Sequence, residues 1–309
     1  MSSTPPTERG LTQLTTEAAR PGLEQLDLEP TATVVAELLQ PLSRLPAMFA
    51  AAEPTIALLV DRIVDRLRRG GRLIIAGAGT SGQLARNEAM ECVPTFGLRP
   101  GRVVALVAGG FDVAGTAFDS AEDDEQAARR DVDDLGVGEP DVLLGISASG
   151  RTPYVLAALA RAAGRGADTL GLTNNAGTAL ADRCTHTLVL ETGAEVPAGS
   201  TRMAAGTAQK VALNTLTTGA MIKLGRTFGS WMIDVATTNE KLRHRAIRII
   251  AEATGHDLAT AARADRDTDH DVAAAIFMLR TGVDGGTAVS RLAACNGRLR
   301  DALTRWSSA

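Results

Sequence analysis

The 309-residue sequence contains few aromatic residues, few cysteines and few histidines. Because aromatic side chains make up only 3% of the chain, its core must be built mainly from Ala, Val, Leu and Ile. The three cysteines, Cys92, Cys184 and Cys295, lie far apart without C-x-x-C spacing, which argues against a disulfide framework and a thiolate zinc cluster. The four histidines are scattered too, with no H-E-x-x-H motif, so we expect no metal site.

The sequence also lacks a large excess of charge and a long apolar run. Its net charge of -4 offers no basic surface for nucleic acid or for an anionic membrane. No apolar run approaches the length of a membrane-spanning helix, and the polar start MSSTPPTERG does not look like a signal peptide. We therefore expect a cytoplasmic protein that binds neither nucleic acid nor membrane.

What the sequence does contain is an alternation of short apolar runs and segments with helical periodicity. Runs that are apolar throughout and separated by helices are typical of a parallel sheet covered on both faces. The predicted strands are 72–77, 102–109, 141–148, 168–173 and 186–191, and the predicted helices between and before them are 55–69, 81–91, 122–134, 153–164 and 178–183. The pattern predicts an α/β fold with three αβα layers around a five-stranded parallel sheet.

The strand signal disappears after Gly199, where long helices are predicted over 203–224 and 235–254 and shorter ones up to about residue 304. We expect three parts, listed from the N-terminus: an arm and helix over 1–54, an α/β domain over 55–230 and a helical C-terminal region over 231–309.

The stretch GAGTSG, residues 77–82, follows the first predicted strand and matches the G-x-G-x-x-G pattern of dinucleotide-binding folds. Such a fold places an acidic residue at the end of the second strand to bind the ribose hydroxyls. Here the second strand, RVVALVAGG, ends in glycines and has no carboxylate. We therefore expect no nicotinamide cofactor.

Three hydroxyl-rich segments precede predicted helices and indicate a phosphate site instead. Backbone N–H groups, hydroxyls and the positive end of a helix together bind phosphate, although each hydroxyl taken alone could simply cap its helix. The loops after the first and third predicted strands should meet at one edge of a parallel sheet. The candidate phosphate and sugar ligands are Thr80, Ser81, Gly82, Ser149, Gly150, Thr152, Ser200 and Thr201.

Several stretches together resemble the N-acetylmuramic acid 6-phosphate etherase family, whose members have the sugar isomerase (SIS) fold. They are GRLIIAGAGTSG at 71–82, ECVPTFG at 91–97, SAEDDE at 120–125, SASGRTPYV at 147–155, GSTRMAAGTAQK at 199–210 and MIDVATTNEKL at 232–242. The resemblance spans nearly the whole chain. The sequence departs from the usual family pattern at Gln83, Glu88 and Ala204, where the family usually has Arg, Asp and Lys.

The resemblance implies an enzyme, a carbon–oxygen lyase that cleaves the D-lactyl ether of N-acetylmuramic acid 6-phosphate. The products would be N-acetylglucosamine 6-phosphate and D-lactate, in the recycling of cell-wall amino sugars. By the same resemblance the enzyme is a homodimer without cofactor or metal. The resemblance also makes Glu91 the acid that protonates the departing lactate oxygen, and Glu122 the second acid/base residue.

Two alternatives share the fold and the phosphate loops. A sugar-phosphate isomerase would move a proton between C1 and C2 without releasing lactate, and a non-catalytic regulator would only bind the sugar phosphate. If 81–91 is one regular helix, Glu91 lies about 15 Å along it from Ser81. Either the chain bends, or Glu91 of a second subunit completes the site.

Overall fold

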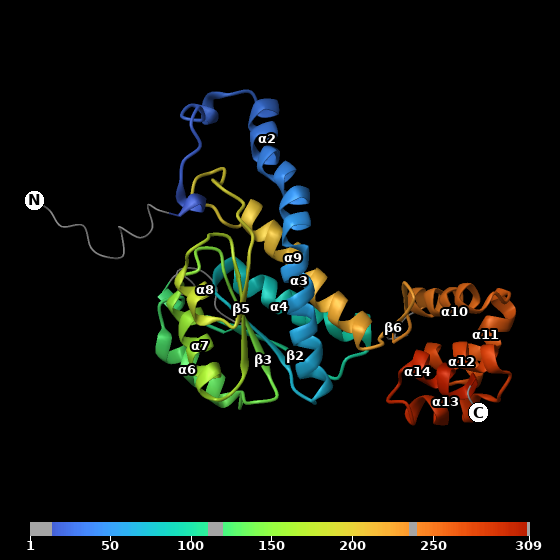
Figure 1. Ribbon diagram of the computed structural model, residues 1–309. Helices are drawn as coiled ribbons and strands as arrows, with labels where there is room; N and C mark the ends of the chain where they lie inside the picture. The colour runs from blue at the N-terminus through green and yellow to red at the C-terminus, as the bar shows by residue number, and fades with distance from the viewer. Residues whose placement is uncertain (1–13, 111–119, 235–239, 308–309) are drawn as a thin grey trace, which may run out of the picture. The chain divides into compact units, whose positions relative to one another are not determined.

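Figure 1 shows the computed structural model, which describes residues 14–110, 120–234 and 240–307. The chain divides into two compact units. The first comprises Met1–Ala89 and Gly101–Leu216, and the second comprises Met90–Pro100 and Thr217–Ala309. The predicted division at residues 54 and 230 stays a prediction.

The first unit contains the predicted five-stranded sheet. Its strands are β1 (Leu73–Gly77), β2 (Val103–Val107), β3 (Val142–Ser147), β4 (Asp168–Thr173) and β5 (His186–Val189). All neighbouring strands are parallel, in the order β2-β1-β3-β4-β5. Every residue of β1, β3 and β4 is buried, as expected for a parallel sheet covered on both faces. The predicted α/β fold class is confirmed.

Helices cover the two faces of this sheet. The helices on one face are α6 (Glu125–Asp134), α7 (Pro153–Gly164) and α8 (Ala179–Arg183), which pack in one apolar cluster with Ile74 and Leu143. Helix α3 (Leu45–Arg68) contacts β1, β3 and β5. Successive strand residues point to opposite faces of the sheet, so a strand that is apolar throughout packs against the helices on both faces. The structure therefore has the three predicted layers (Figure 1).

The N-terminal part of the first unit is more helical than its sequence suggests. It contains η1 (Thr15–Glu17), η2 (Leu26–Leu28), α2 (Thr31–Leu39) and η3 (Gln40–Arg44) before α3. The prediction that the α3 helix starts at residue 55 was wrong, because α3 starts at Leu45 and includes Pro54. The fully buried residues of α3 begin at Ile56, and Pro54 looks like a helix breaker in the sequence, which hides the first part of the helix.

The second unit is mostly helical and is built around its own apolar core. Its helices are α10 (Glu240–Thr254), α11 (Leu258–Asp267), α12 (Val272–Thr281), α13 (Gly285–Ala293) and α14 (Leu299–Ser307). It also contains a two-stranded antiparallel sheet, β6 (Thr227–Phe228) with β7 (Trp231–Met232). The expectation that no strand follows Gly199 was therefore wrong. Residues 235–239, which begin the predicted 235–254 helix and belong to the MIDVATTNEKL stretch, lie outside the described residues.

No single described helix has the length and apolar composition to cross a membrane. Helices α12 and α13 meet those criteria only as a pair, with a bend of 115° between them.

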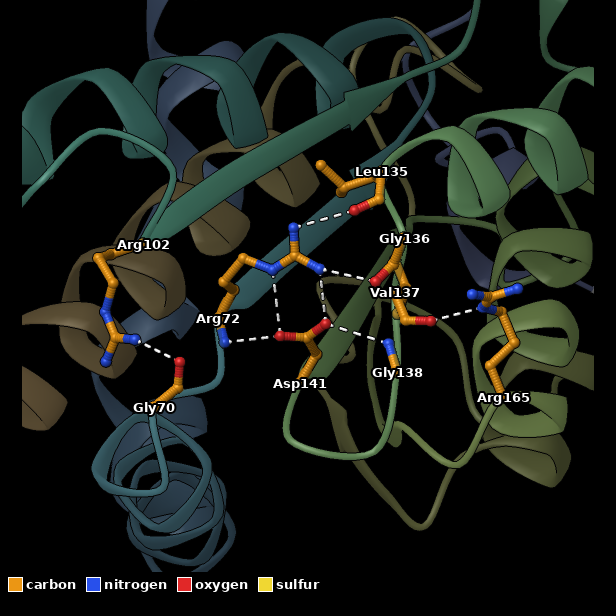
Figure 2. A network of polar contacts seen from close by, with 9 residues as sticks. All are labelled: Gly70, Arg72, Arg102, Leu135, Gly136, Val137, Gly138, Asp141 and Arg165. Atoms are coloured by element: carbon orange, nitrogen blue, oxygen red, sulfur yellow. Dashed lines mark hydrogen bonds and ion pairs between the residues drawn. The ribbon is translucent and has the colours of Figure 1, made fainter.

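At the edge of the sheet where the strands begin, the half-buried Arg72 forms an ion pair with the buried Asp141 (Figure 2). Arg72 Nη2 lies 2.7 Å from Asp141 Oδ2, and the backbone N–H groups of Arg72 and Gly138 donate to the same carboxylate at 2.8 and 3.1 Å. The Arg72 guanidinium also donates to the carbonyls of Leu135 and Gly136. Burial raises the pKa of the Asp141 carboxyl, but the hydrogen bonds from Arg72 and the two N–H groups outweigh it, so this pKa is lowered.

Replacing Asp141 by alanine should lower the free energy of unfolding by about 3 kcal/mol, because the Arg72 guanidinium loses its carboxylate partner and two N–H groups lose their acceptor. The matched control is Asp133→Ala, which removes exposed ion pairs with Arg161 and Arg165 and should cost much less, because solvent screens them. Since the pKa of Asp141 is lowered on folding, its contribution is complete above about pH 4 and is lost as the pH falls further. Urea unfolding at pH 7 and pH 3 measures both effects. Equal losses for the two variants at pH 7 would contradict the prediction.

Candidate active site

The carboxyl ends of β1, β3 and β4 bring the first two hydroxyl-rich segments together. These strands are adjacent, and Gly77 pairs with Ile146 while Ser147 pairs with Thr173 at their ends. The chain after β1 carries Thr80 and Ser81, and the chain after β3 carries Ser149 to Thr152. This edge is where ligands bind to parallel sheets, as predicted.

The first segment forms the start of helix α4 (Gly79–Phe96), so the helix predicted over 81–91 is present and is longer than expected. Gly82 is the first residue whose N–H closes a helical turn, to Ala78 O at 3.0 Å. The N–H groups that precede it have no acceptor within the helix and are available to an anion. A Cβ atom on Gly82 would lie 2.8 Å from Gly77 O, so these glycines allow the helix to pass close to the strand. This close approach accounts for Gly77 and Gly82, while Gly79 has a φ of 52°, in the left-handed region that favours glycine.

The second segment is organised by Ser147, which was not among the ligands predicted from the sequence. Its hydroxyl lies 3.2 Å from Ser149 Oγ and 2.8 Å from Thr152 Oγ1, and it accepts the Gly150 N–H at 3.0 Å. Ser149 Oγ also accepts the N–H of Arg151 at 3.2 Å. Three hydroxyls therefore gather around the last residue of β3, which is 3% exposed. These hydrogen bonds hold Ser149 and Thr152 together in one turn.

Glu122 is held beside this second segment by its backbone. The N–H of Tyr154, in the first turn of α7, donates to Glu122 O at 2.9 Å. The Tyr154 ring is buried, and its hydroxyl donates to Asp131 of α6 at 2.5 Å. Burial, followed by the contact with Asp131, raises the pKa of Tyr154 well above its ordinary value, so this phenol stays protonated. The side chain of Glu122 is exposed. Its backbone bond to Tyr154 places it near Thr152, which precedes Tyr154 by two residues in the chain.

The third segment precedes helix α9 (Ala204–Lys223), whose N-terminus already holds a carboxylate. Glu195 accepts the N–H groups of Ala204 and Ala205 at 3.0 and 2.8 Å, and it is 1% exposed. Burial raises the pKa of Glu195, and the two N–H groups partly offset this rise. Ser200 and Thr201 lie in the turn before these residues, where the Thr201 carbonyl accepts the Gly206 N–H. Their role as ligands stays a prediction.

A buried set of amide side chains connects all three segments. Asn174 and Asn175 follow β4, and Gln209 lies on α9. Asn175 Nδ2 donates to the Ala148 carbonyl in the second segment at 2.9 Å, and its Oδ1 accepts the Thr15 N–H at 2.8 Å. The carbonyl of the next residue, Thr16, accepts the Gly199 N–H of the third segment. Ser81 of the first segment donates to Gln209 at 2.8 Å.

These amide residues were not among the ligands predicted from the sequence. Asn174 and Asn175 could have been found, because polar residues that end a central parallel strand lie at the same edge as the phosphate segments. Gln209 carries no such signal, since it lies within a helix and its partners are far away in the sequence.

Helices α4 and α9 are also joined by an ion pair. Lys210 Nζ lies 3.1 Å from Glu88 Oε2, and Glu88 is 3% exposed. Glu88 is thus a structural partner of Lys210. Glu91 lies one turn further along α4, with an exposed side chain, in the part of the helix that belongs to the second unit. Within the described residues, no group of three His, Cys, Asp or Glu side chains could hold a metal ion.

Comparison with known proteins identifies the family. The SIS domain family model matches residues 40–174. Proteins named N-acetylmuramic acid 6-phosphate etherase from Streptomyces avermitilis and Streptomyces coelicolor are both 46% identical to this chain, covering 95% and 98% of it and 94% and 98% of their own lengths. The chain belongs to the N-acetylmuramic acid 6-phosphate etherase family. The resemblance predicted from the sequence is confirmed.

Solved structures that are similar to this chain have lower identity. A phosphoheptose isomerase from Francisella tularensis is 21% identical with a TM-score of 0.48, over 62% of this chain and 98% of that one. A Vibrio vulnificus protein complexed with ManNAc-6P is 19% identical with a TM-score of 0.43, over 64% of this chain and 66% of that one.

Proposed function

We propose that this chain cleaves the D-lactyl ether of N-acetylmuramic acid 6-phosphate, giving N-acetylglucosamine 6-phosphate and D-lactate. The observation that carries the proposal is the 46% identity, over nearly the full length, to relatives named for that reaction. The two glutamates that the family resemblance assigns to the chemistry, Glu91 and Glu122, are both present.

The reaction needs one proton acceptor and one proton donor. In the open-chain sugar, the C1 aldehyde acidifies the C2 proton, which a carboxylate removes. The C3–O bond then breaks, a C2–C3 double bond forms, and the lactate oxygen takes a proton from a carboxylic acid. Water next adds its oxygen to C3 and a proton to C2. Catalysis requires that the two carboxyl groups have different protonation states at the start, since one accepts while the other donates.

In this proposal the phosphate is not consumed but positions the reacting carbons. The N-terminal turn of α4 and the Ser149–Thr152 turn bind it, the former through the Thr80 hydroxyl and the N–H groups that precede Gly82. Glu122 is the base for C2, and the Tyr154 N–H, which holds its backbone beside the second segment, supports that role.

We further propose that the enzyme is a homodimer in which Glu91 serves the partner's site. One alternative for bringing Glu91 to the site was a bend in the chain between Ser81 and Glu91. Helix α4 instead runs from Gly79 to Phe96 without a break, which favours the other alternative, a site completed by a second subunit. The two residues lie about 15 Å apart along the helix axis, which is too far for both to reach one sugar.

The first test is D-lactate release from N-acetylmuramic acid 6-phosphate, measured with a coupled lactate assay. We expect stoichiometric lactate and N-acetylglucosamine 6-phosphate. Conversion of the same sugar phosphate to a ketose without lactate would support the isomerase alternative. A ligand-induced rise in Tm without any turnover would support a binding protein. Either of those two results would contradict the proposed etherase.

A further inference from the structure

Ser81 lies at one end of a chain of buried hydrogen bonds. Its hydroxyl donates to Gln209 Oε1 at 2.8 Å, and Gln209 Nε2 donates to Asn174 Oδ1 at 2.9 Å. Asn174 Nδ2 in turn donates to the Leu190 carbonyl at 3.0 Å. Asn174 is 0% exposed, Gln209 1% and Ser81 7%, so water cannot replace these partners. We refer to Ser81, Gln209 and Asn174 as the amide chain.

The far end of the amide chain fixes the direction of every bond in it. The Leu190 carbonyl can only accept, so it must face the NH₂ group of Asn174. Asn174 then presents its oxygen to Gln209, which must offer its NH₂ group there and its oxygen to Ser81. Only a donor satisfies that oxygen, and the Ser81 hydroxyl has a single proton. That proton is therefore directed into the protein.

A hydroxyl whose proton is already used cannot donate to a phosphate oxygen. We propose that Ser81 does not bind the phosphate through its hydroxyl, and that Gln209 and Asn174 are positioning residues for the N-terminal turn of α4. This inference rests on the proposed function, and it changes the role expected for Ser81. The phosphate at this turn is bound by backbone N–H groups and by the hydroxyl of Thr80.

Thr80 is suited to that role by its surroundings. Its Cγ2 methyl faces α9, where a Cβ atom on Gly206 would lie 3.3 Å from it. Within the ranges that the structure describes, the Thr80 hydroxyl makes no hydrogen bond, and the residue is half-buried. Its proton is therefore available to a ligand.

The amide chain also couples the first segment to the second. The Asn174 N–H donates to the Ala148 carbonyl at 3.1 Å, and Ala148 lies between Ser147 and Ser149. The buried Asn174 therefore fixes the direction of the Ser81 hydrogen bond through Gln209, and it also holds the backbone of the second segment at Ala148. Loss of Gln209 should consequently affect phosphate affinity without any contact between Gln209 and the ligand.

The test measures the Kd of N-acetylglucosamine 6-phosphate by calorimetry for Ser81→Ala, Gln209→Met and the double variant, well below their Tm. Thr80→Val is the matched control, because it removes one hydroxyl from the neighbouring residue. We expect Thr80→Val to raise Kd about tenfold or more, as for a lost hydrogen bond to a charged group. Ser81→Ala and Gln209→Met should each raise Kd about threefold, and the double variant no more than either, because both break the same bond.

A rise in Kd for Ser81→Ala alone that matches the tenfold rise expected for Thr80→Val would overturn the proposal, since it would show that the Ser81 hydroxyl contacts the phosphate while Gln209 is in place. A lowered Tm with unchanged Kd in both single variants would also overturn it, by leaving Gln209 a structural role only. If Gln209→Met does not fold, a larger rise in Kd for Ser81→Ala than for Thr80→Val decides against the proposal.

Binding requires no turnover, so this test can support the inference even if the wild type releases no lactate. Failure of the proposed function and failure of the inference are thereby distinguished. No binding of N-acetylglucosamine 6-phosphate to the wild type would overturn both.

Discussion

Glu122→Gln should reduce kcat for D-lactate release by about 10²–10⁴-fold, because glutamine cannot take the C2 proton. Glu91→Gln should cause a loss of similar size, because glutamine cannot protonate the leaving lactate. Both side chains are exposed, so neither change should alter Tm by more than a small amount. A kcat close to that of the wild type in either variant would remove that glutamate from the mechanism.

Deuterium exchange separates the two roles. In D₂O, Glu91→Gln retains the base and should still exchange the C2 proton of the substrate for deuterium while releasing little lactate. Glu122→Gln lacks the base and should show neither exchange nor release. The reverse pattern would mean that the two glutamates have exchanged roles.

Mixing the same two variants tests the homodimer with a shared site. If Glu91 of one subunit acts with Glu122 of the other, each hybrid dimer has one intact site and one with both changes. After random exchange of an equal mixture, about half of the dimers are hybrids, so about a quarter of the wild-type activity should return. If each site is built from one chain, no activity returns.

The sheet and the two strand-end segments could be predicted from sequence because their signals are local. Apolar runs such as LLGIS in β3 are long enough to show burial on both faces, and the hydroxyl residues follow them directly. The rule that parallel strands end at a common edge then places Ser81 near Ser149 without any knowledge of packing.

The amide chain could not be predicted, because it depends on contacts distant in sequence. Gln209 meets Ser81 only through the packing of α9 against α4, and a single glutamine in a helix looks like an ordinary surface residue. The β6–β7 hairpin was missed for a different reason. Each of its strands has two residues, which is too short for an alternating pattern to appear.

Gly150→Ala should have the second largest effect, because it disturbs the turn that holds Ser149 and Thr152. Gly150 has a φ of 63°, in the left-handed region that favours glycine. A Cβ atom there would lie 2.5 Å from the Cβ of Thr178, which is 1% exposed and caps helix α8. Neither backbone can yield easily, because the Gly150 carbonyl accepts the Leu180 N–H at 3.0 Å.

Gly177→Ala is the matched control for this change. Gly177 has nearly the same φ, 62°, but a Cβ atom there would meet nothing within 4 Å. It should cost about 1–2 kcal/mol of unfolding free energy from backbone strain alone and leave activity intact. Gly150→Ala carries the same strain together with the clash, and should cost about 2–5 kcal/mol.

The activity of Gly150→Ala should fall further than its stability alone explains. Displacement of the turn by about 1 Å moves the phosphate and misaligns C2 and C3, which corresponds to a loss of about 10²-fold in kcat/KM for the folded enzyme. Urea unfolding and steady-state kinetics on both variants measure the two effects separately. Equal stabilities and equal kcat/KM for Gly150→Ala and Gly177→Ala would show that the contact with Thr178 does not hold this turn, and the phosphate would then have to be positioned by the N-terminal turn of α4 alone.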